Sequence, residues 1–275
     1  MRTRPFSHGA AWALAILASA LPACTYPAVT ALATTAAETV DEFDAIVEDS
    51  ARSVWTEKAL GIALDQSGAD TLPERPWTSD DEQAMLEIND GVRAYFEVLA
   101  SLADDDVVNF DAELDGLAAP LKPGKVSEEA IGSYGALVKI TASAVGGWIR
   151  HRALCRALRD AAPQISEICT LYRVVGKGYR NKLKRERSQL DMLPPDARVA
   201  RTADVDRRMR HAEAFLVAVE KLEATLAQVA IDPSDLDGDR IKQLVGEYRR
   251  DVEPSTRVMR SERGGRVRSR IGGRR

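Results

Sequence analysis

Several kinds of residue and pattern are scarce in this chain of 275 residues. Aromatic residues make up only 5% of it, so a core must be filled mainly by the aliphatic residues and alanine within its 45% hydrophobic content. No segment alternates apolar and polar residues as a half-buried strand does. Apolar residues recur instead at steps of three and four. This spacing predicts an all-α protein, an antiparallel bundle of about five to six long amphipathic helices.

The motifs of common enzyme classes are also missing. The sequence has no Gly-x-Ser-x-Gly, no Walker loop, no Gly-x-Gly-x-x-Gly and no His-Glu-x-x-His. It has only three histidines, and His8 lies in the extreme N-terminal segment. A histidine general base therefore has few places to sit, and we expect neither enzymatic activity nor a cofactor.

The N-terminal segment has the layout of a bacterial export signal. Arg2 and Arg4 supply positive charge, and residues 9–21 form an apolar stretch that suits a signal and is too short to span a bilayer. The stretch ends in Leu21-Pro22-Ala23-Cys24, which resembles the lipobox of bacterial lipoproteins. Pro22 departs from the small or β-branched residue of that pattern, and the resemblance covers only the signal region.

The resemblance implies that residues 1–23 are removed and that Cys24, acylated with palmitate-like chains, becomes the mature N-terminus. Thr25 after the cysteine is similar to the outer-membrane sorting class. We therefore expect a lipid-anchored periplasmic protein that binds or scaffolds an envelope protein or an anionic lipid, and no nucleic acid. Two alternatives remain open: secretion with cleavage after Ala18-Ser19-Ala20, and Cys24 as a plain small apolar residue.

The rest of the chain divides by composition. Residues 24–37 are small and have no period, so we expect a flexible tether. Residues 38–253 carry the helical spacing and form the expected bundle domain. Residues 254–275 contain eight Arg and one Glu, and we expect a disordered basic tail. Since residues 24–126 hold 22 acids and 6 bases, folding of the tail onto this acidic half is a further hypothesis.

Caps and breakers give approximate helix boundaries, with Pro163 expected to break or kink the chain. A short extra helix is predicted near 112–117. The main helices are predicted at about 38–64, 79–104, 127–159, between Pro163 and Pro194, 197–229 and 238–252.

Cys155 and Cys169 are the first candidates for a site, because two cysteines in an oxidising compartment favour a disulfide. Each lies seven residues from Ala162, so a hairpin about Ala162-Pro163 would bring them face to face. A helix that merely kinks there would hold them about 21 Å apart, too far for a bond. Both arrangements remain open, as does the plain role of two buried small side chains.

Metal binding is a weaker hypothesis. The histidines and the same two cysteines reach the number of ligands that zinc needs, although their spacing matches no zinc module. The set is His151, Cys155, Cys169 and His211. Four aspartates around Gly238 resemble a calcium loop, but an EF-hand alignment puts Pro233 and Leu244 where acids are required. We expect no metal, and the alternative function is a soluble periplasmic protein that binds a small ligand or metal between helices.

A basic run in the second half of the chain is the last candidate. Interrupted by Glu186, it comprises Lys177, Arg180, Lys182, Lys184, Arg185 and Arg187. On an envelope protein such a run can bind lipid phosphates or an acidic partner. The alternative is a solvated helix face.

Overall fold

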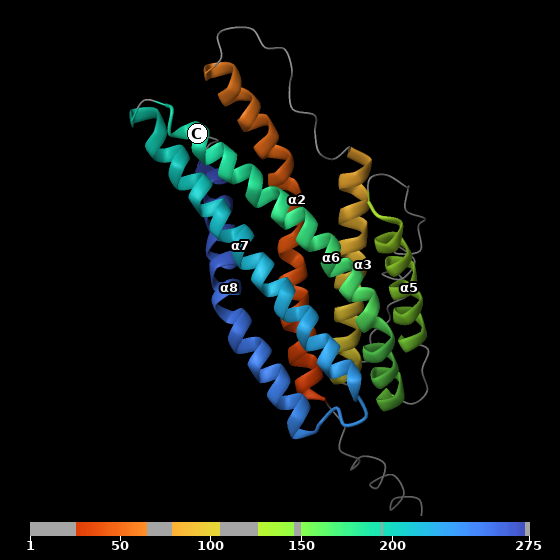
Figure 1. Ribbon diagram of the computed structural model, residues 1–275. Coiled ribbons are helices and arrows are strands. Elements are labelled where there is room, and N and C mark those ends of the chain that lie inside the picture. Colours follow the sequence, from red (N-terminus) through yellow and green to blue (C-terminus); the bar gives the residue numbers. More distant parts are fainter. Residues whose placement is uncertain (1–25, 65–78, 105–125, 146–149, 194, 273–275) are drawn as a thin grey trace, which may run out of the picture.

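The computed structural model describes residues 26–64, 79–104, 126–145, 150–193 and 195–272 (Figure 1). Every element in these ranges is a helix, and the helices pack as a bundle, which confirms the predicted fold class. They are α2 (Pro27–Leu64), α3 (Ser79–Asp104), α5 (Glu128–Val145), α6 (Arg150–Leu190), α7 (Pro195–Ile231) and α8 (Asp239–Gly272). The segment with Cys24 and the short helix predicted near 112–117 lie outside the described residues.

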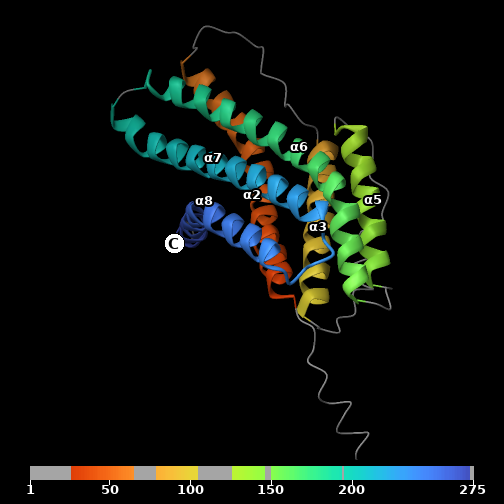
Figure 2. The ribbon, with the colours of Figure 1, turned by 60° about the horizontal axis from the view of Figure 1, so that its bottom comes forward.

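The bundle is organised around α2. This helix leads away from the end of the molecule where Tyr26 lies, which we call the Tyr26 end. Helices α3, α5 and α7 run back toward that end, whereas α6 and α8 run away from it (Figure 1). Helix α2 contacts α3, α6, α7 and α8, while α5 packs against α3 and α6 at one edge (Figure 2). The first and last described helices therefore lie side by side.

The few aromatic residues are concentrated where α2, α6 and α7 meet. The ring centroid of Phe43 lies 4.3 Å from that of Tyr172 and 6.0 Å from that of Phe215. All three side chains are fully buried. Burial of each such side chain stabilises the fold by roughly 1.5–3 kcal/mol. The rings therefore fix the centre of a core that is otherwise aliphatic.

The beginning of α2 corrects the tether expected at residues 24–37. The chain is helical from Pro27 onward, and Val29, Leu32, Ala33 and Ala36 are completely buried. Proline at the first helical position loses no hydrogen bond, because that N–H has no partner within a helix. The small side chains that hid the period in the sequence let neighbouring helices pack closely.

Two prolines expected to interrupt the chain lie inside helices. Helix α6 continues through Pro163, and the change of direction falls between α5 and α6, so the helix predicted at 127–159 is wrong. Helix α8 continues through Pro254 to Gly272, so the predicted disordered tail is wrong for residues 254–272. A proline removes one backbone hydrogen bond from a helix. Packing on both sides compensates in α8, where Val252 and Met259 are buried.

Candidate functional site

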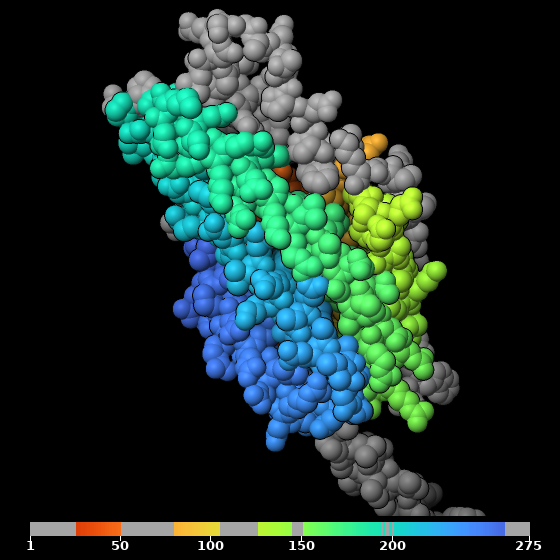
Figure 3. All heavy atoms as spheres, viewed as in Figure 1, coloured from red at the N-terminus to blue at the C-terminus, as the bar shows by residue number. Residues whose placement is uncertain are grey.

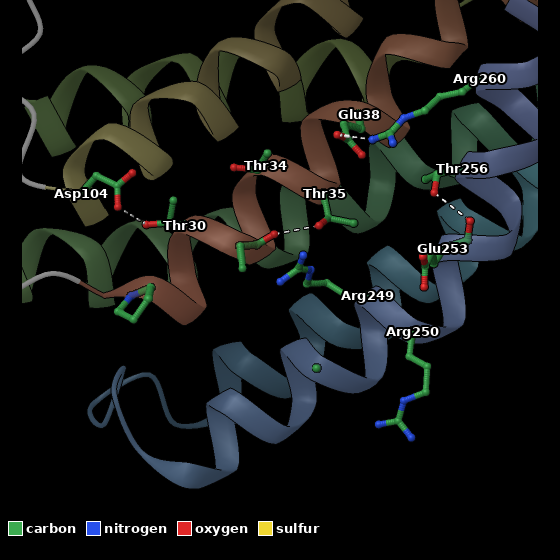
Figure 4. A pocket seen from close by; sticks show the side chains of 13 residues that line it. Thr30, Thr34, Thr35, Glu38, Asp104, Arg249, Arg250, Glu253, Thr256 and Arg260 are labelled. Carbon is green, nitrogen blue, oxygen red and sulfur yellow. Dashed lines mark hydrogen bonds and ion pairs between the residues drawn. The ribbon is translucent and has the colours of Figure 1, made fainter.

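A groove of about 720 Å³ runs between α2 and α8 near the Tyr26 end (Figure 4). One wall is the threonine-rich first half of α2, and the other is the arginine-rich middle of α8. Small residues in the lining, such as Ala31 and Gly246, leave the space open. The groove brings together two segments that are more than 200 residues apart in sequence.

The carboxylates in this lining are all engaged. Glu38, Asp104 and Glu253 contact Arg260, the Thr30 hydroxyl and Arg257, respectively. The Thr30 hydroxyl donates to Asp104 over 2.9 Å, and the two ion pairs are solvent-exposed. Exposed ion pairs contribute little to stability. Their effect here is to occupy the acids that would otherwise neutralise the remaining cations.

Two arginines of α8 are the remaining cations. Neither Arg249 nor Arg250 forms a hydrogen bond or salt bridge with any residue that the structure describes. In Figure 4 Arg249 extends from α8 toward α2, whereas Arg250 turns away from the groove. The groove therefore presents one unpaired guanidinium inward and a second at its edge.

The threonine hydroxyls of the lining differ in availability. Thr35 donates to the Ala31 carbonyl over 2.8 Å and Thr256 to the Glu253 carbonyl over 3.0 Å, so their helices use both hydroxyls. Thr34 is exposed, and its hydroxyl has no partner in the described part of the chain. A guanidinium opposite a free hydroxyl suits an oxyanion such as a phosphate or carboxylate.

Tyr26 fixes the start of α2 to the rest of the bundle beside this groove. Its backbone N–H donates to the Ala103 carbonyl over 2.9 Å, and its hydroxyl lies 3.2 Å from Nδ1 of His151. Nε2 of His151 is 3.5 Å from Cys155 Sγ, and that thiol donates to the Pro233 carbonyl over 2.9 Å. One chain of contacts thus joins α2, α3, α6 and the turn before α8.

The contacts of Cys155 assign it a structural role. Burial raises the pKa of this thiol, so it is protonated at neutral pH and can donate to Pro233. A neutral His151 that donates from Nε2 to the sulfur and accepts from the Tyr26 hydroxyl satisfies the whole chain. A protonated thiol in such a contact is neither a nucleophile nor a metal ligand.

The predicted disulfide between Cys155 and Cys169 is wrong. Both thiols are free, and both lie on the uninterrupted helix α6. Fourteen residues along one helix correspond to about 21 Å, far beyond bonding distance. Cys169 is buried, and burial raises its pKa to about 12. The hairpin that would have paired the cysteines does not form because α6 continues through Pro163.

The predicted basic run does not form one surface. Lys177, Lys184 and Arg185 are exposed, and Arg180 is half-buried. Lys182 lies inside the bundle, where its Nζ donates to Ser50 Oγ over 3.0 Å. The sixth member, Arg187, forms ion pairs with Asp191 and Asp206 over 2.6 and 3.1 Å. Only part of the run is therefore available to a partner.

A layer of buried charged side chains lies between α2, α6 and α7. Glu186 is 1% exposed and pairs with Arg208 over 2.8 Å, and Arg208 also reaches Asp204 over 2.9 Å. His211 is equally buried, with Nε2 3.5 Å from the Glu42 carboxylate. Buried charges of opposite sign hold helices in register and do not by themselves indicate catalysis.

The sequence contained a signal for this layer that the search for site motifs missed. Lys182 and Glu186 follow Tyr179 by three and seven residues, so they continue the inward-facing positions of α6. On α2, Glu42 and Asp49 are likewise seven residues apart, and both are buried. A charge at an apolar position of a helix predicts a buried partner, because burial without one is very unfavourable.

Metal ligands do not converge in the part of the chain that the structure describes. No group of three His, Cys, Asp or Glu side chains there is close enough to hold an ion. His151 and His211 belong to separate contacts at different levels of the bundle. The groove between α2 and α8 is therefore the better candidate for ligand binding.

Comparison with known proteins assigns no relative. No protein-family model matches the sequence, and no curated protein or solved structure is significantly similar to it. Among the helices described, none has the length and apolar content needed to cross a membrane.

Proposed function

We propose that this chain is a lipid-anchored protein of the bacterial envelope that acts by binding, and that the groove between α2 and α8 receives an anionic group. The observation that carries this proposal is the placement of Arg249, an unpaired cation directed across the groove toward α2. Guanidinium groups bind phosphate and carboxylate oxygens through paired hydrogen bonds. The role is binding or scaffolding of an envelope component.

The position of the groove supports the link to the anchor. Pro27, which lines the groove, follows Cys24 by only three residues. Tyr26 is already fixed to α3 and α6, so about 7 Å of chain separates it from the cysteine. An acylated Cys24 would therefore hold this end of the bundle at the headgroups. The anionic groups of a membrane would then lie within reach of the groove.

The anchor is tested on the full-length chain expressed in a bacterium. Intact-mass analysis of wild type should give a mature N-terminus at Cys24 with added acyl chains, and the protein should fractionate with membranes. Cys24→Ser should carry no acyl chain and should leave the membrane fraction. A wild-type mature N-terminus at any other residue, without fatty acid, would overturn the anchor.

Binding in the groove is tested separately, with thermal unfolding as the readout. A ligand that binds the folded state raises the melting temperature. The probes are sodium phosphate, short-chain phosphatidylglycerol and short-chain phosphatidylcholine, so that free phosphate and an anionic lipid headgroup are distinguished. We expect stabilisation by one of the two anionic probes and none by phosphatidylcholine. The effect should be lost in Arg249→Ala and kept in Arg257→Ala, and an unchanged effect in Arg249→Ala would contradict the proposal.

A further inference from the structure

The outer face of α6 and α7 carries charge of opposite sign on its two helices. These helices lie side by side on the near face of the molecule, with no other described helix over them (Figure 3). A second groove, of about 600 Å³, runs between them. Its α6 side carries Arg173, Lys177 and Arg180, and its α7 side carries Glu213, Glu220 and Glu223. The face is therefore split lengthwise into a basic row and an acidic row.

Most of these charges are not neutralised within the chain. Arg173 and Glu223 form an ion pair across the groove. Lys177, Arg180, Glu213 and Glu220, by contrast, have no hydrogen bond or salt bridge to any described residue. The Nε atom of Arg180 is even buried without an acceptor. Two free cations on one helix thus face two free carboxylates on the next.

Apolar side chains lie between and beside the charged rows. Val174 is 56% exposed and Val217 is 45% exposed, which is high for valine. Leu216 contributes to the floor of the groove, close to Gly176, where any side chain would collide with it. An exposed apolar strip between charged rows has the composition of a small protein interface.

We propose that this face binds the same face of a second copy of the chain. The two rows have opposite signs, so a copy turned about a twofold axis parallel to the helices lays its α6 over α7 of the first. Lys177 and Arg180 of each copy then meet Glu213 and Glu220 of the other, and the valines are covered. A twofold axis perpendicular to the helices would stack α6 on α6 and oppose like charges. Charge complementarity thus selects the parallel axis.

The dimensions of the face suit a stable dimer. Helix α7 has 37 residues and is about 55 Å long at 1.5 Å per residue, and two adjacent helices are about 20 Å wide. A common interface buries about 800 Å² on each partner. The face offers about that area without help from any other element.

The same axis keeps both Tyr26 ends on one side of the dimer. If Cys24 is acylated, which is the proposed function, both anchors enter one leaflet. The dimer itself rests only on the face of α6 and α7, and so it does not require the anchor. A Cys24→Ser chain should form the same dimer in solution.

Two charge-reversed forms of the full-length chain test the dimer. The first carries Lys177→Glu with Arg180→Glu, and the second carries Glu213→Lys with Glu220→Lys. Each form alone has two rows of the same sign and should associate at least tenfold less than wild type. Mixed together, the two forms should associate again, because the acidic α6 of one then meets the basic α7 of the other.

Association is measured by co-purification of two differently tagged copies in detergent, and by light scattering for the Cys24→Ser chain. Circular dichroism establishes that each form is folded. The matched control is Lys139→Glu with Arg152→Glu, which reverses two exposed charges elsewhere and should behave as wild type. Wild-type association should also weaken in 1 M salt. Self-association of both reversed forms at the wild-type level, or no recovery on mixing, would overturn the dimer.

Discussion

Helices α6 and α7 are held together differently in their two halves. Toward the Tyr26 end the contact is apolar, with Ile165, Ile168, Leu222 and Leu226 at most 2% exposed. Toward the opposite end the contact includes buried charges, with Glu186 and Arg208 at its centre. The apolar half contributes cohesion that tolerates sliding, whereas each buried charge has one acceptable position. The comparison shows how one pair of helices can divide stability and register between its halves.

The largest effect is expected from breaking the buried ion pair. Arg208→Met leaves the Glu186 carboxylate buried without this partner, and should reduce the free energy of unfolding by about 4 kcal/mol. The measurement is urea unfolding followed by circular dichroism.

A double variant sharpens that test. Arg208→Met combined with Glu186→Leu removes both charges, so we expect recovery to within about 1 kcal/mol of wild type. A double variant as unstable as the single one would show that the charges themselves, rather than their mutual compensation, stabilise this half.

The apolar half should respond by a different mechanism. Leu222→Ala leaves a cavity at a completely buried position and should cost about 3 kcal/mol of the free energy of unfolding. This loss should not change with ionic strength, in contrast to effects at exposed charges. The control is Gln228→Ala, an exposed position on the same helix, where a change within about 0.5 kcal/mol is expected.

The smallest effect concerns the ion pair at the edge of the apolar half. Burial alone would raise the pKa of Glu223, but hydrogen bonds from Arg173 and Ser166 outweigh it and lower the pKa. The resulting stabilisation is present above the unfolded pKa of roughly 4.3 and is lost as the pH falls through the folded value. Glu223→Gln should therefore be less stable than wild type at pH 7, by under about 1 kcal/mol.

A pH series of melting temperatures checks this prediction. The difference between wild type and Glu223→Gln should shrink below about pH 4 as the wild-type carboxylate becomes protonated. A difference that stays constant down to pH 2 would mean that the amide fails for a steric reason instead.

Helix number and most inward-facing positions could be predicted from apolar spacing alone. The acidic first turn of α3, for example, begins at the expected Ser79. Boundaries at prolines could not, since the spacing gives no measure of how much packing surrounds Pro163 or Pro254. The end of α5 at Val145 did have a signal, because Gly146 and Gly147 follow it in the sequence.

The candidate site was harder to predict than the fold. Its cations, Arg249 and Arg250, lie in an ordinary-looking helix, and its opposite wall falls in the stretch expected to be a tether. Spacing within one helix does not reveal which helix lies next to it. The basic run was visible in the sequence, but only tertiary packing shows that Lys182 faces inward and Lys177 outward.

The contacts of Tyr26 have a consequence for reach. A protein on a long flexible leash samples a wide zone above its membrane, but here the leash would be a single residue, Thr25, between the acylated cysteine and the first fixed side chain. Helix α2 has 38 residues and is about 57 Å long. The bundle would then act as a post of set height, with the turn between α6 and α7 carried at its top.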